Sequence, residues 1–401
     1  MINPFLDTFG EATRTAMGFF WKSGWAFVFG YVISAMIQAF VPKARLTRFM
    51  GSADFRSVAL ATVFGAASSS CSFAALAAAR SLILKGAHFV AAVAFMFAST
   101  NLVVELGILI LIFLGWQFLA AEIAGGVVLI AISSLIIRAT YPEHWLARAR
   151  EKVEAETEDE DADFDWRKRI ASLDGWARVG ANFAHDWQMV WKEILIGFTI
   201  AGFVATLVPP AAWEAIFLTE AGAALPGWLV ALENAMVAPF VAAATFIGSM
   251  GNIPLATVLN ANGVLFAGIM GFIYSDLMVP PLVAVNAKYY GWRTALYIAG
   301  VMYVSIVATA LILTGAFTLL GITPESGKAV SDVVRFQMDY TFWLNLAAIV
   351  LTGAMLWLLR RHRRTHGTHH HKMEGDGPLK RAAAKLAIGT LAAGAAAWAL
   401  S

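Results

Sequence analysis

Charged residues and cysteine are both scarce in this sequence of 401 residues. Only 14% of the residues are charged, whereas soluble globular domains carry about 25%. The single cysteine, Cys71, excludes an intramolecular disulfide framework. A formal net charge of +2 gives no basic footprint of the kind that nucleic-acid-binding proteins carry, so no nucleic-acid partner is expected.

Motifs of enzymes and nucleotide-binding sites are also missing. The sequence contains no P-loop, HExxH, CxxC or GxSxG pattern, so we expect no enzyme, no cofactor, no metal site and no ATP-driven step in this chain. The first residues lack the basic region, short apolar core and small-residue cleavage site of a signal peptide. The first apolar segment is therefore expected to be retained.

Long uncharged runs are the feature that the sequence has in abundance. Examples are 23–42, 57–79 and 234–275. A helix needs about 20 apolar residues to cross a hydrocarbon core about 30 Å thick, and the last of these runs is long enough for two crossings. The composition therefore predicts an all-α polytopic membrane protein with a lipid bilayer around it, and we expect the inner membrane of a bacterium.

One charged segment divides the chain. Residues 151–165 carry nine acidic side chains in fifteen positions, which is typical of a solvated connector. We therefore predict membrane repeat 1 at 1–142, a cytoplasmic linker at 143–191 and membrane repeat 2 at 192–322. Residues 323–401 are expected to add an outer loop, a spanning helix at 340–359, a basic and histidine-rich tail and an alanine-rich segment whose relation to the membrane stays open.

Polar breaks recur at corresponding places in the two apolar halves. The first half has a break at Ser68–Ser72 and a second polar cluster at Ser99–Asn101. The second half has a break at 248–252 and a second cluster at Ser275–Asp276. Repeated interruptions of this kind point to the binding site of a secondary transporter.

Basic loops suggest how the breaks are oriented. Residues 43–56 and 80–88 are both basic, so the positive-inside rule favours one side of the membrane for both and makes 57–84 a re-entrant hairpin. A second hairpin at 228–262 would then enter from the opposite side. This predicts two inverted repeats with about eight spanning helices plus two hairpins, including helices at 88–113, 116–138, 192–213, 263–285 and 294–320. Ordinary spanning helices with kinks are the alternative.

The hairpin tips supply the candidate substrate-binding residues, because hydroxyls, amides and unwound backbone at membrane depth need a protein or water-filled environment. Small residues that only let helices approach closely are the alternative explanation. Cys71 could be a ligand for a soft, thiol-reactive solute or simply a packing residue. The candidates are Ser68, Ser69, Ser70, Cys71, Ser72, Ser249, Met250, Gly251, Asn252 and Asn101.

Acidic residues inside apolar runs are candidates for proton or cation coupling, because they are costly in lipid. Asp276 and Glu105 adjoin the second polar clusters and are the stronger pair. Glu122 could pair structurally, and Glu233 could be interfacial. Basic residues after the first hairpin could line a vestibule or anchor the chain at the headgroups, and the histidines of the tail are expected to be solvated. These are Arg80, Lys85, His88, His366, His369, His370 and His371.

At the two breaks the sequence resembles the predicted permease family that includes the ArsP organoarsenical exporters. The residues that carry this resemblance are SSCSFAAL (69–76), MGNIPL (250–255), RSLILKGA (80–87) and FMFASTN (95–101). The family's first motif cysteine is replaced by Ser69 and its motif proline by Ala75. The resemblance implies a permease fold and an efflux role, whereas these departures argue against a thiol pair that binds a trivalent metalloid.

Three functions follow as hypotheses. The first is a secondary permease that exports a small solute, such as a metalloid or thiol-reactive compound, through a site between the hairpin tips. The second is a passive channel for a small neutral solute, since the tips carry little charge. The third is a membrane scaffold whose acidic segment 151–165 recruits a partner. The sequence fixes neither the substrate nor the oligomeric state.

Overall fold

The computed structural model of the chain consists of helices, and no strand occurs in the residues that it describes. This confirms the predicted all-α class. The helices follow from long apolar stretches rich in Ala, Leu and Ile, whose backbone groups must be satisfied within the segment in a membrane. The described residues are 4–40, 50–68, 72–84, 86–140, 166–219, 225–245, 248–324, 330, 336, 338–366 and 378–400.

The first half begins with one long helix and continues with a hairpin of two shorter ones. A bent pair and a further long helix complete it. Asp54 caps the first arm of the hairpin, because its Oδ1 atom accepts a hydrogen bond of 2.9 Å from the backbone N–H of Ser57. The elements are α1 (Pro4–Phe40), α2 (Phe55–Ser68), α3 (Ser72–Leu84), α4 (Phe89–Asn101), α5 (Val104–Phe113) and α6 (Trp116–Thr140).

The second half repeats this order after a short helix. Its first long helix starts within the segment predicted as linker and ends before Pro209 and Pro210, which cannot continue it. The acidic block 151–165 lies outside the described residues. The elements are α8 (Trp166–Ala171), α9 (Leu173–Leu207), α10 (Pro210–Phe217), α11 (Gly227–Thr245), α12 (Ser249–Ala261), α13 (Phe266–Ile273), the 3₁₀ helix η3 (Tyr274–Met278), α14 (Pro280–Tyr290) and α15 (Trp292–Leu320).

An interruption between helices occurs at the first predicted break, whereas the second lies just before the predicted segment 248–252, because residues from Ser249 onward already belong to α12. The chain leaves α2 at Ser68 and enters α3 at Ser72, and it leaves α11 at Thr245 and enters α12 at Ser249. The segments expected as single helices at 88–113 and 263–285 are each divided, with bends of 42° and 41°. These bends fall at the second polar clusters, where side chains compete with the helix for backbone groups.

Six described helices are long and apolar enough to cross a membrane, or up to eight if each bent pair is one span. This range agrees with the predicted polytopic architecture. One difference concerns α11, which the sequence assigned to a hairpin but which has the length of a span by itself. The equal order of elements in the two halves is what two repeats predict, and their inversion stays a prediction. The six are α1, α6, α9, α11, α15 and α17 (Tyr340–His366).

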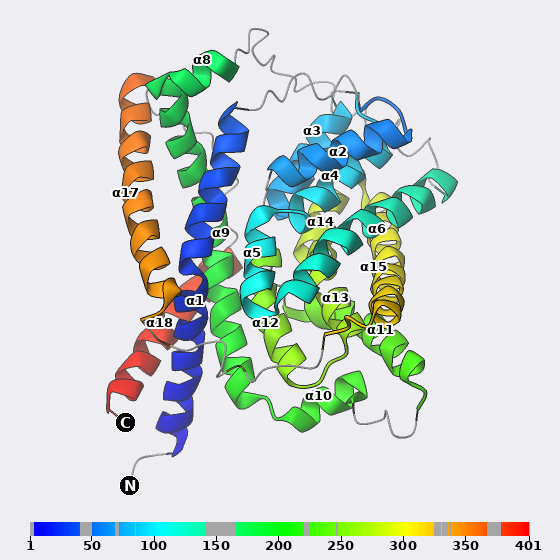
Figure 1. Cartoon of the computed structure of the whole chain (residues 1–401), viewed down its shortest axis with the longest axis vertical. Helices are drawn as coiled ribbons and strands as arrows, with labels where there is room; N and C mark the ends of the chain where they lie inside the picture. The colour runs from blue at the N-terminus through cyan, green and yellow to red at the C-terminus, as the bar shows by residue number, and fades with distance from the viewer. Residues whose placement is uncertain are drawn as a thin grey trace.

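Two C-terminal helices cover one side of the central pair. The helices α1 and α9 lie side by side along the long axis, and α17 and α18 (Pro378–Leu400) pack against both of them (Figure 1). Small residues permit this close approach, since a Cβ atom at Gly180 of α9 would lie 2.6 Å from Cβ of Leu358 in α17. The short helix α8 also packs on α9, and the other helices form the part of the molecule that contains the bends (Figure 1).

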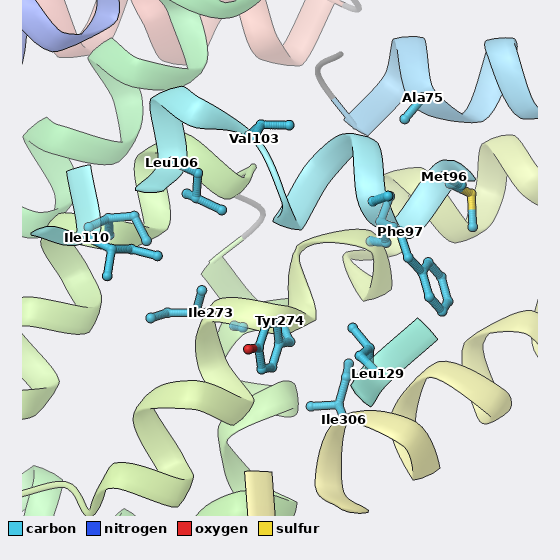
Figure 2. Close-up of a cluster of buried hydrophobic side chains, with 14 of the residues drawn as sticks. Ala75, Met96, Phe97, Val103, Leu106, Ile110, Leu129, Ile273, Tyr274 and Ile306 are labelled. Carbon is cyan, nitrogen blue, oxygen red and sulfur yellow. The ribbon is translucent and has the colours of Figure 1, made fainter. Parts of the chain in front are cut away.

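The buried core is shared by the two halves. Figure 2 shows Phe97 and Leu129 from the first half in one cluster with Tyr274 and Ile306 from the second. All four side chains belong to the buried core. The bends at both second polar clusters are therefore enclosed by apolar side chains. The polar groups at the bends must find their hydrogen-bond partners within the protein.

Candidate functional site

Asp276 is the centre of the candidate site. It lies in η3, at the bend between α13 and α14, and its side chain is fully buried. Oγ of Ser72 donates a hydrogen bond of 2.9 Å to its Oδ2 atom. Because Ser72 is the first residue of α3, the tip of the first hairpin contacts the polar cluster of the second half.

The tip of the second hairpin reaches the same carboxylate. Ser249, the first residue of α12, lies close enough to Asp276 to influence its carboxylate, whose Oδ1 atom has no hydrogen-bond partner among the described residues. Ser249 and Ser72 are both buried, with 8% and 4% of their surfaces exposed. The structure therefore brings three sequence-predicted residues together, two from the hairpin tips and one from a bend.

Two buried amides keep unused hydrogen-bonding atoms. Nδ2 of Asn101 donates to the carbonyl of Phe97 at 3.1 Å, whereas its Oδ1 atom has no hydrogen-bond partner among the described residues. Oδ1 of Asn252 accepts a bond of 3.4 Å from Oγ1 of Thr245, but its Nδ2 atom is likewise unpartnered within the described part. Unsatisfied buried polar atoms are uncommon in native structures and need an explanation, such as a transient ligand.

Glu122, for which the sequence suggested a structural pairing, is buried. Its carboxylate oxygens have no hydrogen-bond partner in the described residues, and it lies close enough to Asp276 for the two charges to interact. The hydroxyl of Tyr274 donates a hydrogen bond of 2.9 Å to the carbonyl of Ala121, which precedes Glu122 in α6. Gly125, one turn further along α6, provides the space for that hydroxyl, because a Cβ atom there would overlap it.

The other intramembrane acids have different surroundings. Glu105, the second predicted coupling residue, is buried against α1, where a Cβ atom at Gly30 would overlap its side chain. Glu233 is partly buried, and its Oε2 atom accepts a bond of 2.8 Å from Nδ2 of Asn234. Of the two predicted coupling residues, Asp276 is therefore the one whose contacts join the two hairpin tips.

Several predicted residues have local roles or cannot be placed. Oγ of Ser68 donates to the carbonyl of Gly65 at 2.9 Å, while Met250 and Gly251 belong to the first turn of α12. His88 caps α4 through a bond of 3.2 Å from the N–H of Val90. Ser69, Ser70, Cys71, Lys85 and His369–His371 lie outside the described residues.

Arg80 was expected to line a vestibule or to lie at the headgroups, and the histidines of the tail were expected to be solvated. The guanidinium of Arg80 stacks over the ring of Tyr289 in α14, 4.6 Å from its centroid. The described residues contain no group of three or more His, Cys, Asp or Glu side chains that could hold a metal ion. His366 is the last residue of α17.

Glu193 is a neighbour of the site that sequence reasoning missed. It lies in the middle of α9, and a Cβ atom at Gly248 would be only 2.8 Å from its Oε2 atom. Its charge also acts on Asp276. In the sequence, Glu193 follows Lys192 at the edge of the charged linker, where a carboxylate is expected to be solvated.

The second arms of the two hairpins, α3 and α12, both begin close to Asp276 in this structure. An open pocket of about 870 Å³ lies elsewhere, between the ends of α11 and α15, and it is lined by Phe118, Trp228, Phe266 and Thr318 among others. None of Ser72, Ser249 and Asp276 lines it. The hydrogen bond of Ser72 to the carboxylate joins the first hairpin to the bend of the second half, and the site between the tips stays a prediction.

Comparisons with known proteins point to a transporter. Residues 8–315 match the family ArsP_1, which is described as "Predicted permease". The chain is 35% identical over 328 residues to a protein named "Putative permease Rv2963" from Mycobacterium tuberculosis (strain ATCC 25618 / H37Rv), and the alignment covers 79% of each chain. No solved structure matches significantly.

Proposed function

The chain belongs to the ArsP_1 family of predicted permeases, and we propose that it is a secondary permease whose substrate passes between the two hairpin tips. One observation supports the location of the site: Ser72, the first residue of the first hairpin's second arm, donates a hydrogen bond to Asp276, and Ser249, its counterpart in the second hairpin, lies nearby. A substrate path at this point would be closed by one carboxylate and opened by its release.

Coupling follows from the charge of Asp276. Hydrogen bonds to a charged group stabilise by about 1.5–3 kcal/mol, against about 0.5–1.5 kcal/mol for a neutral pair. A proton or a cation on the carboxylate would therefore weaken its hydrogen bond with Ser72. The tips could then separate, so occupancy of Asp276 and opening of the path would be linked.

The proposed substrate is a small solute, and the proposed direction is efflux across a bacterial inner membrane. Hydroxyls and amides at the site offer hydrogen bonds to a polar but uncharged group, and Asn101 and Asn252 have atoms available for it. The resemblance at the breaks implies efflux of a thiol-reactive or metalloid compound, for which Cys71 would be a single thiol ligand in place of a thiol pair. Phenylarsine oxide is a suitable probe of that chemistry.

Uptake of phenylarsine oxide into everted membrane vesicles with an imposed proton gradient tests the proposal. Asp276→Asn should reduce gradient-driven uptake about tenfold or more, which corresponds to about 1.4 kcal/mol or more, because an amide cannot take up the proton whose binding opens the path. Asp186→Asn is the matched control, because Asp186 is also buried but accepts its bond of 2.7 Å from Gln38 of α1 and not from a hairpin serine.

Three outcomes separate the hypotheses. Loss of uptake in Asp276→Asn with normal uptake in Asp186→Asn supports a coupled permease. Equal uptake in the wild type and Asp276→Asn would remove the assigned site. Uptake that persists without any gradient, and does not saturate, would favour the passive channel.

A further inference from the structure

The C-terminal helix brings a cation to the edge of the candidate site. Nζ of Lys380, in the first turn of α18, lies 2.8 Å from Oε1 of Glu193. We propose that Lys380 is a positioning residue of the transport site, which holds Glu193 against the second hairpin tip and so keeps the two tips closed. This inference rests on the proposed permease function for its biological meaning, but its structural part can be tested separately.

Glu193 is the link between Lys380 and the tip. Its carboxylate has two oxygens with different neighbours: Oε1 meets Lys380, while Oε2 faces Gly248, where an added Cβ atom would lie 2.8 Å away. Gly248 is the N-cap of α12, so Ser249 follows it directly. The positive end of a helix favours a nearby carboxylate, which gives Glu193 a reason to stay at this position.

The other end of α18 is fixed on α1. A Cβ atom at Gly394 would overlap the side chain of Thr13, and one at Gly10 would lie 3.3 Å from Cα of Trp398. The two helices therefore pack backbone against backbone near the chain's C-terminus. This contact limits where the first turn of α18 can lie, and Lys380 is held beside Glu193.

The pair also balances charge in an apolar segment. Glu193 lies within α9, a helix apolar enough to cross a membrane, and only 17% of its side chain is exposed. Removing one partner of such a pair leaves an uncompensated charge, and that loss costs more than the pair itself contributes. Without Lys380, the free carboxylate beside Gly248 would repel Asp276, which it already influences, and would draw water to the tip.

The chain's own single cysteine gives a readout that needs no substrate. Cys71 precedes Ser72 in the sequence, so separation of the tips should change its access to a small maleimide. In proteoliposomes containing the full chain, Lys380→Met should raise the rate of Cys71 labelling by N-ethylmaleimide about fivefold, a factor that corresponds to about 1 kcal/mol for a partly exposed pair.

Three further variants isolate the ion pair. Lys380→Arg keeps the charge and should label like the wild type. Lys385→Met changes an exposed lysine of the same helix and is the matched control. In a Glu193→Gln background, Lys380→Met should add no further effect, because the two side chains act as one unit.

The outcomes distinguish this inference from the proposed function. Labelling of Lys380→Met at the wild-type rate, or an equal change in Lys380→Arg, would overturn the positioning role. Faster labelling in Lys380→Met alone supports it, even if Asp276→Asn were to leave phenylarsine oxide transport unchanged and so refute the coupled permease.

Discussion

At the scale of single residues, a buried hydroxyl is important to the site when its partner belongs to another element. Ser72 bonds Asp276 across a separation of 204 positions, whereas buried Ser133 donates only to the carbonyl of Ile130 within α6. Ser72→Ala should therefore lower gradient-driven uptake of phenylarsine oxide about tenfold, because protonation of Asp276 would no longer control a hydrogen bond to the first hairpin and coupling would be lost. Ser133→Ala is the control and should change uptake little. Equal effects of the two changes would assign the loss at Ser72 to packing alone.

The same distinction explains which site residues could be predicted. Ser72, Ser249 and Asp276 are recognisable because polar groups inside an apolar run need a partner. Their mutual contact is not recognisable, because it depends on how distant helices pack. Glu193 and Lys380 stand in charged or basic stretches of sequence, where the expected partner is water. Their pairing follows from the position of α18 on α1 and α9.

At the scale of elements, the hairpin arm α2 depends on a close approach to α4. A Cβ atom at Gly65 would overlap the carbonyl oxygen of Phe95 and lie 2.8 Å from Cβ of Ala98. Gly65→Val should therefore force the two helices apart, with a cost of about 1–3 kcal/mol. The measurement is the Tm of the detergent-solubilised protein.

The control for this change is a glycine with open space. Gly353 of α17 is exposed, and an added Cβ atom would meet nothing within 4 Å. Gly353→Val should leave the Tm close to that of the wild type. A similar decrease in both variants would show that valine lowers helix stability here by itself and that the contact with α4 contributes little.

The element boundaries show what patterning can and cannot predict. Polar clusters predict the breaks, because side chains that compete for backbone groups interrupt a helix. Helix lengths are harder to predict from the sequence. The helix α9 begins at Leu173, although its first turns carry charged residues that resemble a linker. Packing on α1 and α17 supplies the buried face that stabilises this extension.

At the scale of the whole molecule, the family match and the peripheral helices occupy different parts of the chain. The match covers residues 8–315 and ends within α15, so α17 and α18 lie beyond it. Both helices nevertheless pack on the central pair α1 and α9. They therefore extend the permease core with contacts of their own, at Lys380 for α18 and at Asp339 for α17.

Asp339 attaches the start of α17 to α1, and this contact should depend on pH. Burial by itself would raise the pKa of Asp339, but hydrogen bonds from Thr341 and Lys22 outweigh it and hold the pKa below its usual value. Its Oδ2 atom lies 3.4 Å from Nζ of Lys22. A carboxylate with a lowered folded-state pKa stabilises the fold above its unfolded pKa of about 4, and this contribution is lost as the pH falls through the folded value.

Asp339→Asn removes this charge while keeping an oxygen that can accept from the N–H of Thr341, which now bonds Oδ1 at 2.8 Å. The variant should have a lower Tm than the wild type at neutral pH, by an amount that corresponds to roughly 0.5 kcal/mol for a partly exposed pair. Because protonation removes the charge from the wild type as well, the two Tm values should converge as the pH is lowered below about 4. A difference of the same size at neutral and acidic pH would mean that the shape of the cap, and not the ion pair with Lys22, connects α17 to the core.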